Sequence, residues 1–119
     1  MPDPRAFLPL TTPAFHVLLA LADEQRHGYG IILEVEARTD GQLRLRTGTL
    51  YTILKRLVAD ALIAESDDRP GQDADDERRR YYRLTKLGRD VMKAEAQRLE
   101  RLVSLARDKR VLPARGSTR

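Results

Sequence analysis

The segment TGTLYTILKRL at residues 47–57 has the period of an amphipathic helix, and the rest of the chain can be interpreted around it. One side of this helix is apolar, with Leu50, Ile53, Leu54, Leu57, Val58 and Ala61. The opposite side carries Gly48, Thr52, Lys55 and Ala59, flanked by Tyr51 and Arg56. This outer side is small, hydroxylic and basic, and has no acid before Asp60. A solvated helix face usually mixes Glu with Lys, so this composition indicates contact with phosphates and base edges.

Two shorter helices are expected before it. Thr12-Pro13 predicts the start of the first, with Thr12 as N-cap and Pro13 as first helical residue. This helix is expected to end near Asp23, and its predicted buried side chains are Phe15, Leu18, Leu19 and Ala22, widened by Val17 and Leu21. The second follows His27-Gly28, stops before Thr39, and carries Tyr29, Ile32, Leu33 and Val35.

After Asp60 the pattern changes to that of strands. The apolar run at 62–64, the turn dipeptide Pro70-Gly71 and the sequence RYYRL at 80–84 predict a two-stranded hairpin. Alternation along the second strand places Tyr82 and Leu84 on one face, together with the stem of Arg80. Residues expected on the other face are Arg79, Tyr81 and Arg83.

Charge is strongly polarised along this hairpin. Seven acids and one arginine lie between Glu65 and Glu77, and six basic residues without an acid follow in residues 78–89. The basic foot, with Arg78, Arg79 and Arg80, can reach phosphates, whereas the acidic tip would be repelled by them. Two interpretations of the tip stay open: it folds back onto the arginines, or it points to solvent.

A final helix begins after Thr85, its predicted cap. Apolar residues then recur at spacings of four and three, which is typical of a coiled-coil seam. The seam consists of Met92, Ala96, Leu99, Val103 and Ala106, widened by Leu102. Since so small a domain offers nothing else for this seam to bury against, we expect it to pair with a second copy of the chain.

The predicted fold is mainly α with a small β-hairpin: a winged helix-turn-helix domain plus a C-terminal dimerisation helix. In this plan the third helix enters the major groove of DNA and the hairpin lies along the backbone or minor groove. We expect an N-terminal arm at 1–11, the winged domain at 12–84, the dimerisation helix at 85–110 and a flexible tail at 111–119.

The composition excludes several classes of function. The chain has 119 residues, about one domain, with a net charge of +4, no cysteine and two histidines. Nucleophilic, metal and paired-carboxylate sites cannot be assembled from it, so we expect no enzyme, no metal and no cofactor. The apolar run at 14–22 is too short to span a bilayer and no signal-peptide pattern precedes it, so a cytoplasmic location without membrane contact is expected.

Three blocks in order resemble the PadR family of bacterial transcriptional regulators, in the short form with one C-terminal helix. They are HGYGI at 27–31, TGTLYTILKRL at 47–57 and RRYYRLTKLG at 79–88. The resemblance implies a homodimeric DNA-binding repressor that answers to a small molecule. Family wings are often short and basic, so the acidic segment 67–77 is a departure that puts DNA contact by the tip in doubt.

The predicted function is therefore repression through an inverted-repeat operator, with double-stranded DNA, a second copy and a small hydrophobic or aromatic effector as partners. The alternative is a winged-helix module that binds protein without sequence-specific DNA binding. The predicted DNA-contact residues are His27, Tyr29, Thr47, Gly48, Thr49, Tyr51, Thr52, Lys55, Arg56, Arg78, Arg79, Arg80 and Tyr81.

Overall fold

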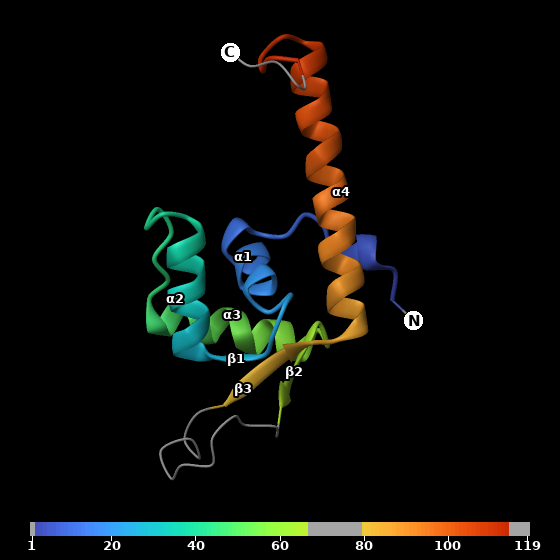
Figure 1. Ribbon diagram of the computed structural model, residues 1–119. Coiled ribbons are helices and arrows are strands. Elements are labelled where there is room, and N and C mark those ends of the chain that lie inside the picture. Colours follow the sequence, from blue (N-terminus) through green and yellow to red (C-terminus); the bar gives the residue numbers. More distant parts are fainter. Residues whose placement is uncertain (1, 67–79, 115–119) are drawn as a thin grey trace.

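The computed structural model describes residues 2–66 and 80–114, and Figure 1 shows its arrangement. Helices α1, α2 and α3 gather beside a small sheet, and α4 rises from the sheet and extends well beyond the other elements (Figure 1). In chain order the elements are η1 (Pro4–Phe7), α1 (Thr12–Ala20), β1 (Arg26–His27), α2 (Gly28–Arg38), α3 (Thr47–Ala59), β2 (Ile63–Ser66), β3 (Tyr81–Leu84) and α4 (Lys86–Asp108). The predicted order of helices and hairpin is confirmed.

The predicted two-stranded hairpin is present as β2 and β3, and a third strand that was not predicted, β1, extends the antiparallel sheet of the described residues to the order β1-β3-β2. The hairpin strands β2 and β3 pair with Ile63 opposite Leu84 and Ser66 opposite Tyr81. Strand β1 joins the other edge of β3, with Arg26 opposite Tyr82. Two residues are too few to show an alternating pattern, so only the tertiary pairing identifies this strand.

Strand β1 also changes the environment of Tyr81. The sequence pattern placed its ring on the outer face of the hairpin, but only 7% of Tyr81 is exposed. His27 lies opposite Tyr81 across the β1–β3 pair, and the two rings meet edge to face with centroids 5.3 Å apart. Tyr81 is therefore buried rather than exposed for DNA contact, because an unpredicted strand packs its own side chain against this ring.

Helix α1 starts and ends earlier than predicted. Its N-cap is Thr11, whose hydroxyl accepts a hydrogen bond from the Ala14 amide at 3.2 Å, so Thr12 already belongs to the helix. The helix ends at Ala20 rather than near Asp23. Leu19 was predicted to be buried but is 43% exposed.

The core lies where α1, α2 and α3 meet the sheet. Its most deeply buried side chains come from all three helices and from β2 and α4: Val17, Leu18, Ile31, Leu50, Leu54, Ile63 and Val91. In α3 the buried side is the predicted one, except that Ala61 lies beyond the helix end, exposed, with a positive φ of 62°. The opposite side of α3 is thereby left to solvent.

The first half of α4 is part of the same core. Thr85 caps the helix as predicted, accepting the Gly88 amide at 3.0 Å. A Cβ at Gly88 would overlap the carbonyl oxygen of Leu62, so glycine allows the helix to approach β2 closely. Met92 was predicted to contact a second copy, but it is 8% exposed and packs in the core of its own chain. The dimer seam was thus extended too far toward the start of α4.

The segment predicted as an N-terminal arm lies against α4. Phe7, Leu8 and Leu10 are partly buried against the core. The Leu10 amide donates a 3.0 Å hydrogen bond to the carboxylate of Glu95, a side chain that is itself 2% exposed. Of the predicted tail, the structure describes only residues 111–114.

Candidate nucleic-acid interface

The N-terminus of α3 is open at the protein surface. Its N-cap is Arg46, which makes no side-chain capping bond to the first turn. The first helical residues, Thr47, Gly48 and Thr49, are all exposed. The first amides of a helix have no partner inside the helix, and with the helix dipole they favour an anion. This turn can therefore receive a phosphate.

No contact among the described residues explains why position 48 is a glycine. A Cβ built at this position would find no atom within 4 Å. Glycine makes a helix less stable than alanine does, so Gly48 does not stabilise α3. Packing among the described residues therefore does not account for the glycine at this exposed position.

The outer face of α3 is basic and accessible. Thr52, Lys55 and Arg56 are exposed, and the Thr52 hydroxyl donates to the Gly48 carbonyl at 3.0 Å. Arg56 pairs with Asp60 at 3.3 Å while its side chain stays 79% exposed. Lys55 has no acidic partner within 4.0 Å among the described residues. Both cations can reach a polyanion without losing a buried contact.

Tyr51 is placed by the start of α2. A Cβ at Gly28 would come within 2.5 Å of the Tyr51 hydroxyl, so the absence of a side chain at this glycine makes room for the tyrosine. The tyrosine nevertheless remains 46% exposed. Its hydroxyl thus lies at the junction of α2 and α3, where a phosphate donor was predicted.

His27 caps α2. Its Nδ1 accepts a hydrogen bond from the Gly30 amide at 3.1 Å, and its ring packs on Tyr81. His27, which was predicted as a DNA contact, thus has a structural role as the N-cap of α2. Tyr29, two residues later, is 64% exposed and is free to contact a partner surface.

The foot of the hairpin is represented by Arg80. Its guanidinium forms a 3.0 Å ion pair with Glu65 on the neighbouring strand. Together with Lys55 and Tyr51 these residues border a groove of about 340 Å³ between α3 and the hairpin. The predictions for Arg78, Arg79 and the acidic tip at 67–77 lie outside the described residues.

One basic residue escaped the sequence reasoning. Arg46 is exposed directly before Thr47 and has no acidic partner within 4.0 Å among residues 2–66 and 80–114. The available signal was the pair of arginines at 44 and 46, separated by the buried Leu45. Such an alternating pair presents both charges on the same side of an extended segment.

The second half of α4 carries apolar side chains that remain exposed among the described residues. Leu99 and Val103 are each 37% exposed, Leu102 is 50% exposed and Leu105, not among the predicted contacts, is 55% exposed. Ala96 is also exposed and Ala106 is half-buried. This half extends away from the core, so the core formed by the described residues does not bury these side chains (Figure 1).

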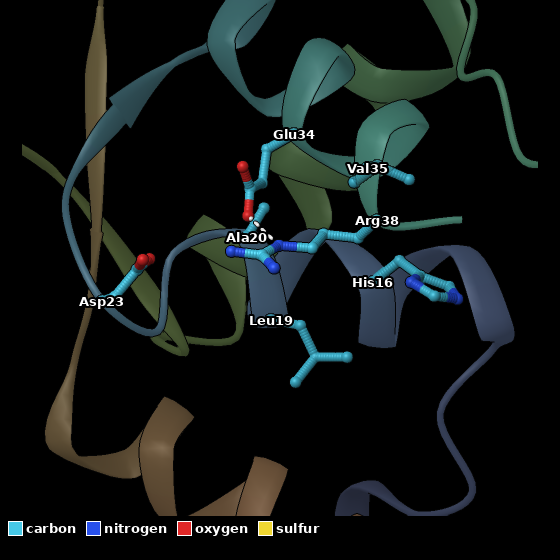
Figure 2. Close-up of a pocket in the computed structure, with 7 residues that line it drawn as sticks. All are labelled: His16, Leu19, Ala20, Asp23, Glu34, Val35 and Arg38. Carbon is cyan, nitrogen blue, oxygen red and sulfur yellow. Dashed lines mark hydrogen bonds and ion pairs between the residues drawn. The ribbon is translucent and has the colours of Figure 1, made fainter. Parts of the chain in front are cut away.

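Two further cavities, each larger than the groove beside Arg80, lie next to the core. Figure 2 shows one of about 410 Å³, between α1 and α2, in which Glu34 pairs with Arg38 at 2.9 Å beside His16 and Leu19. A second cavity, of about 480 Å³, lies between the N-terminal segment and α3. Among the described residues, no cluster of three metal-ligating side chains occurs, and no helix combines the length and apolarity needed to cross a membrane.

Three packed helices, a paired hairpin and an exposed third helix define a winged helix-turn-helix protein. The sequence profile of the Transcriptional regulator PadR-like family matches residues 17–94, and the chain belongs to this family. Members of this family are transcription regulators, not enzymes.

Relatives agree with this assignment. Transcriptional regulator Rv3488 of Mycobacterium tuberculosis is 36% identical over 87 residues, which cover 73% of this chain and 75% of the relative. A PadR family transcription regulator of Clostridium difficile is 26% identical, with a TM-score of 0.62 over 82% of this chain and 98% of that one. Bacillus subtilis PadR, solved with operator DNA, is 19% identical and shares the fold, with a TM-score of 0.60 over 72% and 46% of the two chains.

Two other relatives are matched over less than two thirds of their own length. The match spans 64% of an uncharacterised protein of Lysinibacillus sphaericus and 22% of one encoded in a Streptomyces fradiae transposon. Operator, partners and regulation are therefore matters of proposal.

Proposed function

We propose that this chain is a homodimeric repressor that binds an inverted-repeat operator through the outer face of α3. The observation that carries the proposal is the accessible N-terminus and basic face of this helix, with Gly48 open to the outside. Lys55 and Arg56 supply the positive charge, and Thr47 to Thr49 supply amides and hydroxyls at the anion-binding end of the helix. Bacillus subtilis PadR, which shares this fold, has been solved in complex with operator DNA.

Dimerisation is proposed through the second half of α4. Leu99, Leu102, Val103 and Leu105 are exposed in the single chain, and burying them against the same surface of a second copy would remove apolar area from water. A two-fold dimer presents two copies of α3, which suits an operator with two inverted half-sites.

A small hydrophobic or aromatic effector is also proposed as the signal that relieves repression. The cavity of about 410 Å³ between α1 and α2 supports it, since ligand sites usually have volumes of several hundred Å³ and mostly apolar walls.

The test is footprinting and gel-shift titration on the region upstream of the gene that encodes the chain, at several salt concentrations. A repressor of this kind protects two symmetric half-sites, and its affinity falls steeply with salt because phosphate contacts release counterions. Scrambled DNA of equal length is the control. Failure to bind any upstream DNA at low salt would favour the alternative, a winged-helix module that binds protein.

A further inference from the structure

A cavity of about 480 Å³ lies between the N-terminal segment and α3, and it borders the proposed DNA-contact face, with which it shares Thr52 and Arg56. Its floor is apolar and consists largely of side chains that also touch the core: Phe7, Leu10, Ile53, Leu57 and Leu62. Its rim is polar and includes Thr11, Thr52, Arg56 and Asp60. The volume falls in the range of small-molecule sites.

The wall formed by the N-terminal segment is anchored. Leu10, which lines the cavity, donates its amide hydrogen to the buried carboxylate of Glu95 at 3.0 Å. Arg98 holds this carboxylate in turn, with its Nε 2.6 Å from Oε1. The cavity is thus preformed between α3 and a segment tied to α4, which lowers the cost of ordering on binding.

The cavity carries both signs of charge at its rim, and the acid is the more buried of the two. Its rim has one ion pair, Arg56 with Asp60 at 3.3 Å, and the two partners differ in exposure: 79% for the Arg56 side chain and 31% for that of Asp60. Water screens the exposed guanidinium more than the half-buried carboxylate. Asp60 is also the C-cap of α3, and the C-terminal end of a helix favours a cation.

We propose that this cavity binds small molecules with an apolar, phenyl-sized body and a protonated amine. The apolar body contacts Phe7, Leu10 and Leu57, and the ammonium group donates to the carboxylate of Asp60. Primary amines of this class satisfy both the apolar floor and the carboxylate, whereas an anion of the same shape would find only the more exposed, water-screened Arg56 as a partner.

Occupation of the cavity is coupled to α3. The ammonium competes with Arg56 for Asp60 and releases the guanidinium toward the outer face, where Thr52 also borders the cavity. A bound cation beside α3 and a released Arg56 both add positive charge near DNA, so the amine tightens operator binding. By linkage, DNA tightens amine binding by the same factor. This coupling, unlike the binding itself, rests on the proposed function.

The binding test is isothermal titration calorimetry of the full chain, without DNA, with three probes of similar shape. They are phenethylammonium, the neutral 2-phenylethanol and the anionic 3-phenylpropionate. We expect saturable binding of phenethylammonium, and affinities at least about tenfold weaker for the other two, because only the cation forms a charge-assisted hydrogen bond.

Two variants and a matched control locate the site. Asp60→Asn should remove the preference for the cation, and Ala6→Trp should abolish binding by filling the cavity from an exposed position. Asp90→Asn is the control, because Lys86 and Asp90 form the same i,i+4 ion pair on α4, away from the cavity. Equal affinities for the three probes, wild-type binding by Ala6→Trp, or absence of saturable binding would each overturn the proposed site.

The coupling is measured by gel-shift titration with and without phenethylammonium. Operator affinity should rise about threefold or more in the wild type and stay constant in Ala6→Trp. Amine binding without a change in operator affinity overturns the coupling and leaves the site intact. If the chain binds the amine but no DNA, the proposed function is contradicted. The calorimetric result still tests whether the cavity binds amines.

Discussion

At the scale of single residues, Gly48 is the clearest link between sequence and partner. Replacing it with alanine meets no atom within 4 Å, so Gly48→Ala should stabilise the free chain by about 0.5–1 kcal/mol. The added methyl group faces the surface that we assign to DNA, so operator affinity should fall. Urea unfolding and gel-shift titration measure the two effects; a stabilised variant with unchanged operator affinity would show that nothing approaches Gly48 closely.

Glu95 is the residue that ties the N-terminal segment to α4. Two hydrogen bonds hold the pKa of this carboxyl below its usual value of 4.5 despite its burial. The bond from Arg98 has the larger effect, and the Leu10 amide adds to it. Because the pKa is lower in the folded chain than in the unfolded one, the contribution to stability is complete above the unfolded pKa. It disappears as pH falls through the folded pKa.

Glu95→Gln should therefore destabilise the chain at neutral pH, by about 1–3 kcal/mol, because the charged acceptor is lost inside the protein. The difference in the free energy of unfolding between the variant and the wild type should shrink as pH falls below 4.5. Urea unfolding across this pH range measures it, with the exposed Glu100→Gln as control. A difference that is independent of pH would contradict the role assigned to the Glu95 charge.

At the scale of elements, α3 should separate into residues that read bases and residues that position the backbone. Arg56→Ala should weaken operator binding by about 1–3 kcal/mol, and a base-reading residue also loses preference at one position in each half-site. Lys55→Ala should weaken binding to all sequences alike if it contacts phosphate. Gel-shift titrations against operator and scrambled DNA distinguish the two, and unchanged affinity in both variants would exclude α3 as the recognition helix.

Helix α4 has two halves with different roles. Val91 and Met92 belong to the core of the chain, whereas Leu99 is 37% exposed beyond it. Leu99→Asp should therefore leave the fold intact and break the dimer, because a carboxylate in an apolar interface costs several kcal/mol. Sedimentation should show a monomer that retains helical circular dichroism. Gln97→Asp, at another exposed position of α4, is the control, and an intact Leu99→Asp dimer would reject this interface.

At the scale of the whole molecule, the proposed two-fold dimer makes a prediction about DNA. Half-site centres should lie about one helical turn, ~34 Å, or a multiple apart, because both copies of α3 address the same side of the duplex. Inserting ~5 base pairs, half a turn, turns one half-site to the far side and should abolish high-affinity binding. An insertion of ~10 base pairs is the matched control for length, and equal affinity for both altered operators would contradict a rigid symmetric dimer.

Local signals in the sequence were sufficient for α3, the start of α4 and the hairpin strands. Helical period in residues 47–57, the cap at Thr85 and the aromatic strand at 81–84 each depend on side chains a few positions apart. The exposed outer face of α3 followed from the same period, because the apolar side of that helix had to be buried. Family membership followed from the same blocks.

Contacts between distant residues were decided by the tertiary structure alone. Strand β1 exists because Arg26 and His27 pair with Tyr82 and Tyr81, and this pairing buries Tyr81. The 85-residue separation of Leu10 and Glu95 leaves no local trace of their hydrogen bond. Met92 shows the physical reason: a heptad pattern records which side chains are apolar, whereas the path of the surrounding chain determines whether its own core or a second copy covers them.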